Sequence, residues 1–209
     1  MMILCTVLSM AVAYLLGSIN FAIVVTRLLR HEDIRTMGSG NAGMTNVLRN
    51  LGKGPAVLTF LGDFLKGFVA ILLAKFFCQT MLGDIPVLLL YLTALGAVLG
   101  HTFPLYYHFK GGKGIVVSVG ALCAIATIPI LCCIAAFAIA VALTKTVSVG
   151  SIAACITFPI VLAITRWLQQ DPEMVPEVIL GVLIAGFIIF MHRGNIKRLL
   201  NGEENSFKK

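Results

Sequence analysis

The chain has 209 residues, of which 59% are hydrophobic and 12% are charged. Its mean hydropathy of +0.99 is higher than water-soluble domains of this length normally reach. The net charge of +7 does not indicate a nucleic-acid-binding domain, because the basic residues lie between apolar runs and not in one polar region. The composition therefore predicts an all-α, polytopic membrane protein, with a single integral membrane domain over residues 1–209 and no sizeable soluble domain.

Apolar runs predict the membrane spans, and basic residues predict their orientation. The first three runs are Ile3 to Val25, Pro55 to Phe77 and Ile85 to Phe103. Lys- and Arg-containing segments follow the first and third runs, and short loops of this kind stay in the cytoplasm. Residues 78–84, after the second run, contain no Lys or Arg. We therefore expect that loop to lie outside.

The stretch from Ile115 to Leu143 contains no charged residue and is interrupted by Pro129. As one straight helix it would measure ~44 Å, whereas the hydrocarbon core is ~30 Å thick. Lys113 and Lys145 at its two ends both indicate the cytoplasmic side, which requires an even number of crossings between them. The pattern predicts two short spans around Pro129, although a re-entrant hairpin or local bilayer thinning would meet the same constraint.

Two further runs, Val147 to Leu168 and Val178 to Met191, complete the predicted topology. The loop between these two runs is mainly acidic, so we expect it to lie outside. The segment after the last run is basic, so we expect it to lie in the cytoplasm. The sum is seven transmembrane helices, with the N-terminus out and the C-terminus in.

Three polar, glycine-rich segments interrupt the apolar pattern, and this topology places all three at the cytoplasmic face. Residues 38–49 combine glycines with Ser, Thr, Asn and Arg side chains, which can donate to an oxyanion. Residues 100–114 contain glycines and two lysines just before an apolar helix, as a phosphate loop would, but without Walker A spacing. Residues 147–152 form a hydroxyl-rich helix start, a pattern that more often serves capping and packing.

These segments belong to five motifs whose order resembles the PlsY-type acyl-phosphate glycerol-3-phosphate acyltransferases of bacterial membranes. The resemblance covers nearly the whole chain. The motifs are S-G-N-x-G-x-T-N-x-x-R at Ser39 to Arg49, G-D-x-x-K-G at Gly62 to Gly67, G-H-x-F-P followed by F-K-G-G-K-G at Gly100 to Gly114, V-S-x-G-S-I at Val147 to Ile152, and H-R-x-N-I-x-R-L-L-x-G-x-E from His192. One departure is Val117, where the family commonly has Thr, so no role is assigned to that position.

The resemblance implies a seven-helix enzyme of the bacterial inner membrane with a cytoplasmic active site. It would transfer a fatty acyl group from acyl phosphate to the 1-hydroxyl of glycerol 3-phosphate, giving 1-acyl-glycerol 3-phosphate (lysophosphatidic acid) and phosphate, the first step of phospholipid synthesis. The expected partners are these two substrates and membrane lipid, together with possible contact with the enzyme that supplies acyl phosphate. No cofactor, metal or nucleic acid is expected.

Acyl phosphate is already activated, so such an enzyme must mainly position a hydroxyl and neutralise the charge of two phosphorylated substrates. The candidate catalytic residues are His101 and His192, acting in acid-base chemistry or in oxyanion stabilisation. Asp63 and Lys66 form an i, i+3 pair that is expected to support the site structurally. The expected substrate-binding residues are Ser39, Asn41, Gly43, Thr45, Asn46, Arg49, Lys110, Gly111, Gly112, Lys113, Gly114, Ser148, Ser151 and Asn195.

Ser39, Thr45, Arg49 and Asn195 are assigned to glycerol 3-phosphate, and residues 110–114 to the phosphate of acyl phosphate, although the reverse division stays open. An organic-phosphate transporter or channel is the main alternative, but it would need a midplane site reachable from both faces. A structural partner of a lipid-synthesis complex would not need three anion-binding segments. Gly96 and Gly100 permit close helix packing, either within the chain or between chains.

Overall fold

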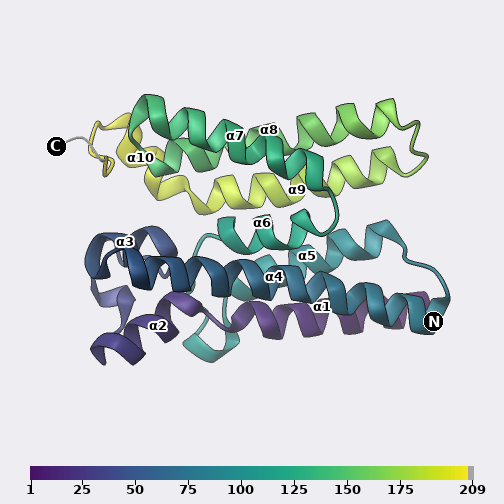
Figure 1. Cartoon of the computed structure of the whole chain (residues 1–209), viewed down its shortest axis with the longest axis horizontal. Coiled ribbons are helices and arrows are strands. Elements are labelled where there is room, and N and C mark those ends of the chain that lie inside the picture. Colours follow the sequence, from purple (N-terminus) through teal and green to yellow (C-terminus); the bar gives the residue numbers. More distant parts are fainter. Residues whose placement is uncertain (207–209) are drawn as a thin grey trace. The chain divides into compact units, whose positions relative to one another are not determined.

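The computed structural model describes residues 1–206, and every regular element among them is a helix. The contacts divide the chain into two compact units, Met1–Ile125 and Ala126 onward, which are described separately. The expectation of one domain over the whole chain therefore stays a prediction. The first unit contains α1 (Met2–Ser18), α2 (Phe21–Arg30), η1 (Ile34–Thr36), α3 (Met44–Leu51), α4 (Lys53–Leu82), α5 (Val87–Thr102), η2 (Leu105–Tyr107) and α6 (Ile115–Cys123) (Figure 1). The second contains α7 (Thr127–Thr144), α8 (Val147–Leu168), α9 (Met174–Met191) and α10 (Arg193–Leu200).

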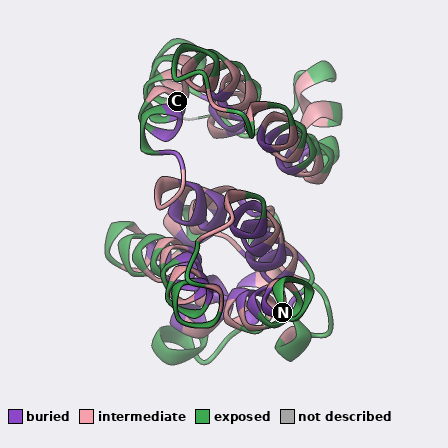
Figure 2. Cartoon of the chain, turned by 90° about the vertical axis from the view of Figure 1, so that its right-hand side faces the viewer, coloured by how far each residue is buried: buried purple, intermediate pink, exposed green. Residues whose placement is uncertain are grey.

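Six segments within the described residues are long and apolar enough to cross a membrane. They include the predicted runs that became α4, α5, α8 and α9, and α8 has the bounds expected from the sequence. Within each unit, buried residues lie on the helix faces that turn toward neighbouring helices, and the outward faces are exposed (Figure 2). Outward faces made of Leu, Ile, Val and Phe suit hydrocarbon as a solvent.

The uncharged stretch after Lys113 is divided as predicted, but not into equal halves around Pro129. The helix α6 has 9 residues and α7 has 18, and the break falls at residues 124–126. Pro129 lies in the first turn of α7, where a missing N–H breaks no hydrogen bond within the helix. At ~14 Å, α6 is too short to span ~30 Å of hydrocarbon on its own, so the seventh span stays a prediction.

The end of α6 is held by a lysine from a neighbouring membrane helix. Nζ of Lys75, in α4, donates a hydrogen bond to the carbonyl of Ala124 at 2.6 Å. A helix that ends within the membrane exposes carbonyl groups that need such donors. This contact explains why a lysine is tolerated within the second apolar run.

The first apolar run is also divided, which the sequence analysis did not predict. The helix α1 ends at Ser18, and α2 begins at Phe21. The side chain of Asn20 caps α2 by accepting the backbone N–H of Ile23 at 3.2 Å. The same side chain donates to the carbonyl of Ala42 at 3.2 Å, so it also holds the first glycine-rich segment. Asn is a preferred capping residue, and it was the available signal for this break.

The glycines of G-x-x-x-G pack within the chain. A Cβ at Gly96 would lie 2.8 Å from the carbonyl oxygen of Met10, and one at Gly100 would contact the carbonyl oxygen of Tyr14. Both partners lie on α1, so this motif brings α1 and α5 into close contact.

We expect Gly100→Ala to lower stability by about 1–3 kcal/mol, because the added methyl group would force two backbones apart. Gly186→Ala is the matched control, since a Cβ at Gly186 in α9 meets no atom within 4 Å among the described residues. The check is the thermal unfolding midpoint in detergent. Equal midpoints for the two variants would contradict the close packing of α1 on α5.

Candidate active site

A buried cluster of three ionisable side chains lies in the first unit. Nζ of Lys66 is 2.7 Å from Oδ1 of Asp63, so the predicted i, i+3 pair is present. His101 joins this pair, because its Nδ1 lies 3.0 Å from Nζ of Lys66 and 3.5 Å from Oδ1 of Asp63. The three side chains are at most 5% exposed.

The same ion pair satisfies the backbone at the break between α1 and α2. Nζ of Lys66 donates to the carbonyl of Ile19 at 2.6 Å, and the N–H of Phe21 lies 3.4 Å from Oδ1 of Asp63. An interrupted membrane helix leaves a carbonyl and an N–H without intrahelical partners, and each is costly when buried. A lysine and a carboxylate together supply the donor and the acceptor that the break requires.

The second glycine-rich segment folds back over His101. The N–H of Gly112 donates to the carbonyl of His101, and the N–H of Gly111 donates to the carbonyl of Thr102, both at 3.1 Å. A Cβ at Gly112 would contact Nε2 of His101 and would lie 2.6 Å from the carbonyl oxygen of Ala42. The two glycine-rich segments therefore meet directly above the imidazole.

Gly111 and Gly112 cannot offer their N–H groups to an anion, because these groups already donate to carbonyls of α5. The N–H groups of Gly111 and Gly112 close the end of α5, whereas a phosphate cradle would direct them to a ligand. Their absence of side chains still allows the close approach to His101. Within residues 110–114, Lys110, Lys113 and Gly114, which precedes the first turn of α6, are left as the predicted phosphate contacts.

In the first segment, Asn46 has a structural position. Its amide donates to the carbonyls of Ile34 and Met37, and its Oδ1 accepts from the N–H of Ser39 and from Asn50, all at 3.0–3.1 Å. Asn46 is only 2% exposed. Since protein partners occupy both ends of this amide, we interpret it as the residue that shapes the loop around Ser39 instead of the substrate ligand predicted from the motif.

Arg35 ties the two glycine-rich segments together and was not singled out in the sequence. Its guanidinium donates to the carbonyls of Tyr107 at 2.9 Å and Lys110 at 3.1 Å, and it pairs with Asp33 at 2.7 Å. The hydrogen bond from Arg35 holds the pKa of Asp33 at about 2, against a partial opposing effect of burial. Asp33 therefore stays ionised at neutral pH and fixes the guanidinium.

The other predicted ligands of the first segment surround the start of α3. Ser39 is exposed, and Asn41 and Thr45 are partly exposed. Gly43 is the N-cap of α3, and Arg49 lies exposed in its last turn. Their substrate contacts stay predictions.

In the second unit, the third glycine-rich segment meets the chain after α10 at one carboxylate. Oε1 of Glu204 accepts hydrogen bonds from Ser148 at 2.9 Å and Asn195 at 2.6 Å, and Oε2 accepts from Arg198 at 2.7 Å. Glu204 is the final residue of the H-R-x-N motif, but the sequence analysis gave it no role. Ser151 lies one turn after Ser148 and is also buried.

His192, between α9 and α10, is 3% exposed. Its Nδ1 lies 2.8 Å from the carbonyl oxygen of Ile188. A carbonyl can only accept a hydrogen bond, so Nδ1 carries a proton, and in the neutral form of the ring Nε2 is the basic nitrogen.

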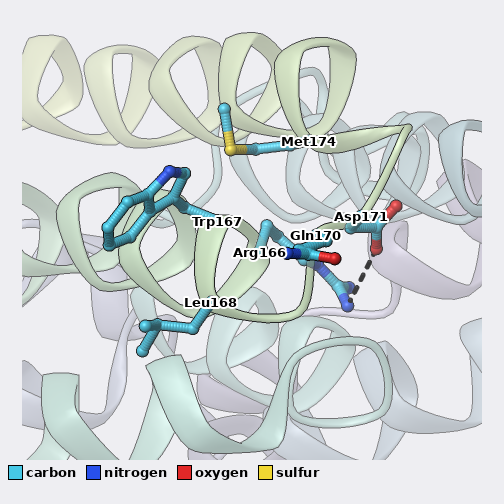
Figure 3. A pocket seen from close by; sticks show the side chains of 6 residues that line it. All are labelled: Arg166, Trp167, Leu168, Gln170, Asp171 and Met174. Atoms are coloured by element: carbon cyan, nitrogen blue, oxygen red, sulfur yellow. Dashed lines mark ion pairs between the residues drawn. The ribbon is translucent and has the colours of Figure 1, made fainter.

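A separate hollow of about 400 Å³ lies at the other end of α8 (Figure 3). None of the predicted site residues lines it. Arg166 reaches Asp171 at 3.4 Å, and the side chains of Trp167 and Leu168 are well exposed. The residues that line this hollow are Arg166, Trp167, Leu168, Gln170, Asp171 and Met174.

The class of protein that this fold and these clusters define is a multi-pass, all-helical membrane protein with polar clusters buried at helix ends. The family model described as glycerol-3-phosphate acyltransferase matches residues 7–202. The chain is 42% identical over 193 residues to the glycerol-3-phosphate acyltransferase of Clostridioides difficile, covering 92% of this chain and 91% of that protein. It is 43% identical over 196 residues to the enzyme of the same name from Pseudomonas fluorescens, covering 93% and 96%.

Two crystal structures of PlsY, an integral membrane glycerol 3-phosphate acyltransferase, also match. The glycerol 3-phosphate form gives a TM-score of 0.83 at 36% identity, and the lysophosphatidic acid form gives 0.80 at 35% identity. Each match covers 97% of this chain and 95% of the other. The chain belongs to the glycerol-3-phosphate acyltransferase family and is an integral membrane acyltransferase.

Proposed function

We propose that this enzyme transfers a fatty acyl group from acyl phosphate to the 1-hydroxyl of glycerol 3-phosphate, releasing 1-acyl-glycerol 3-phosphate and inorganic phosphate. The observation that carries the proposal is the meeting of two glycine-rich segments over His101, with Lys110, Lys113 and Arg49 on those segments. Cationic side chains suit phosphorylated substrates, because they form charge-assisted hydrogen bonds with phosphate oxygens. The related PlsY structures are named for glycerol 3-phosphate and lysophosphatidic acid, the expected acceptor and product.

The chemistry asks little of the protein beyond positioning. The 1-hydroxyl oxygen attacks the acyl carbonyl carbon, a new C–O ester bond forms, and the C–O bond to phosphate breaks. The hydroxyl proton leaves to a base or to the departing phosphate. Because phosphate is a good leaving group, orientation and charge neutralisation supply most of the rate enhancement.

The residue roles follow from the contacts within each unit. Ser39, Thr45 and Arg49 are assigned to glycerol 3-phosphate, and Lys110 and Lys113 to the phosphate of acyl phosphate. His192 is the histidine suited to accept a proton, because its Nδ1–H is committed to a backbone carbonyl. Ser148 and Asn195 hold the carboxylate of Glu204, so their contribution to substrate binding is expected to depend on that residue.

The proposed topology has seven spans in a bacterial inner membrane, and the short helix α6 forms the seventh where the bilayer is locally thinned. The N-terminus lies outside and the C-terminus inside, and the glycine-rich segments face the cytoplasm. The distribution of lysine and arginine supports this orientation. A cytoplasmic site would also allow contact with the enzyme that supplies acyl phosphate.

The proposal is tested by measuring phosphate release from palmitoyl phosphate by the detergent-purified protein, with and without glycerol 3-phosphate. We expect release that depends on glycerol 3-phosphate and falls about 100-fold in Arg49→Ala and in Lys113→Ala, since each variant removes a charge-neutralising group. Arg30→Ala, which removes an exposed arginine at the end of α2, is the matched control and should keep its activity. Release that ignores the acceptor would refute the transferase, and uptake of organic phosphate by proteoliposomes would then favour a transporter.

A further inference from the structure

The ammonium group of Lys66 has as many acceptors as it has protons. Its Nζ lies 2.6 Å from the carbonyl oxygen of Ile19, 2.7 Å from Oδ1 of Asp63 and 3.0 Å from Nδ1 of His101. A lysine ammonium has three N–H donors and no acceptor. A charged Lys66 can therefore donate a hydrogen bond to each of the three acceptors at once.

This arrangement determines which nitrogen of His101 carries the proton. Because Nδ1 accepts from the ammonium, it holds no hydrogen of its own, and the neutral ring must carry its proton on Nε2. A proton on Nδ1 would place N–H against N–H at 3.0 Å. A neutral lysine could accept from Nδ1–H, but it would leave the carboxylate of Asp63 as a buried charge without a compensating cation.

The competing arrangement is an Asp–His dyad, in which Asp63 would accept a proton from Nδ1 and make Nε2 a base. The distances favour the lysine, because Oδ1 of Asp63 lies 3.5 Å from Nδ1 and Nζ of Lys66 lies 3.0 Å away. The same Oδ1 is already engaged with Nζ of Lys66 at 2.7 Å. The dyad is therefore the weaker of the two interpretations.

Nε2 of His101 points at the predicted phosphate loop. It lies where a Cβ of Gly112 would be, beside the backbone of Ala42, so it faces the place where the two glycine-rich segments meet. The residue is 4% exposed, and the side-chain contacts of His101 within residues 1–206 are all made by Nδ1. Nε2 is not among the fully buried polar atoms that lack a partner, so its N–H keeps an opening to the surface through which a ligand oxygen can accept it.

We infer that Lys66 is a positioning residue that holds His101 in its Nε2–H form, so that His101 donates a hydrogen bond to a phosphate oxygen of a substrate and does not act as the base. The inference rests on the proposed function and deepens it. It assigns opposite tautomers to the two candidate histidines, since His192 carries its proton on Nδ1. His101 binds an oxyanion, and His192 has the basic nitrogen.

The first test needs no substrate and so stands apart from the proposed function. The protein is labelled with ¹⁵N-histidine, placed in lipid nanodiscs and studied by two-bond ¹H–¹⁵N correlation spectroscopy at pH 7. His101→Gln assigns one of the four histidines by the loss of its signals. We expect a protonated Nε2 and an unprotonated Nδ1 in the wild type, and loss of this pure tautomer in Lys66→Met. A protonated Nδ1 in the wild type would overturn the inference.

The second test compares two replacements of His101 that differ in hydrogen-bonding ability. The amide of His101→Gln can donate from nearly the position of Nε2, whereas His101→Leu cannot donate. We expect kcat/KM to fall about 10-fold in the first and 100- to 1,000-fold in the second, as for loss of an oxyanion donor. Equal losses in the two variants would overturn the donor role.

The Michaelis constants identify the phosphate that His101 contacts. A raised KM for palmitoyl phosphate in His101→Leu would assign the contact to the acyl donor, and a raised KM for glycerol 3-phosphate would assign it to the acceptor. Unchanged KM values for both would overturn the phosphate contact. The matched control is His192→Gln, which should not be rescued by an amide if His192 supplies the base.

Discussion

Asp63→Asn is expected to destabilise the first unit by about 3–5 kcal/mol, because it leaves the buried ammonium of Lys66 without its counter-charge. The variant also weakens the acceptor for the N–H of Phe21 at the break between α1 and α2. The loss should appear as lower yield and a lower unfolding midpoint in detergent, together with lower turnover. Asp84→Asn, in the exposed loop after α4, is the matched control and should change stability little.

A double variant separates charge from hydrogen bonding. Asp63→Leu/Lys66→Met removes both charges, so it should be more stable than Asp63→Asn, as buried pairs replaced by apolar residues often are. It should remain less stable than the wild type, because Ile19 and Phe21 lose their partners on α4. Normal yield and an unchanged midpoint in Asp63→Asn, with turnover selectively lost, would show that the pair acts in the chemistry and not as support.

The parts of the fold that could be predicted are those that depend on local pattern. The helix α8 has its predicted bounds because charged and polar residues flank a continuous apolar run. The pair of Asp63 and Lys66 follows from their spacing on one helix. The helix α4 runs from Lys53 to Leu82 and so extends beyond the predicted run at both ends, which makes residues 78–82 of the predicted loop helical. The helix ends at Gly83, whose left-handed conformation is the usual C-terminal stop, and not where the apolar run becomes polar.

Features that depend on distant contacts could not be predicted in the same way. The break at Asn20 lies inside an apolar run, and its partners on α4 are more than 40 residues away. His101 was chosen from a motif, but its contact with Lys66 joins two different helices. The motif around Asn46 indicated ligand binding equally well for every polar residue in it, and only the folded loop shows that this amide is occupied by protein groups.

The second large effect is expected for Glu204→Ala, because one carboxylate holds three donors from two segments. Ser148 begins α8, and Asn195 and Arg198 lie on α10, so Glu204 joins the C-terminal segment to the start of a membrane helix. Removing the acceptor of two buried donors costs about 1–3 kcal/mol for each, and charged acceptors cost more. We therefore expect a lower unfolding midpoint and a loss of activity, with Glu204→Gln intermediate.

The pH dependence and a neighbouring residue provide the controls for Glu204. Burial raises the pKa of Glu204, but hydrogen bonds from Asn195, Ser148 and Arg198 outweigh it and lower the pKa below 4.5. A lowered pKa means that this stabilisation is fully present above the ordinary value and is lost as the pH falls through the lowered one. The difference in unfolding free energy between the wild type and Glu204→Ala should therefore become smaller at acidic pH.

Glu203→Ala removes an adjacent exposed carboxylate and should match the wild type. Equal effects of the two alanine variants would mean that net charge, and not the contact with Ser148 and Asn195, stabilises the C-terminal segment.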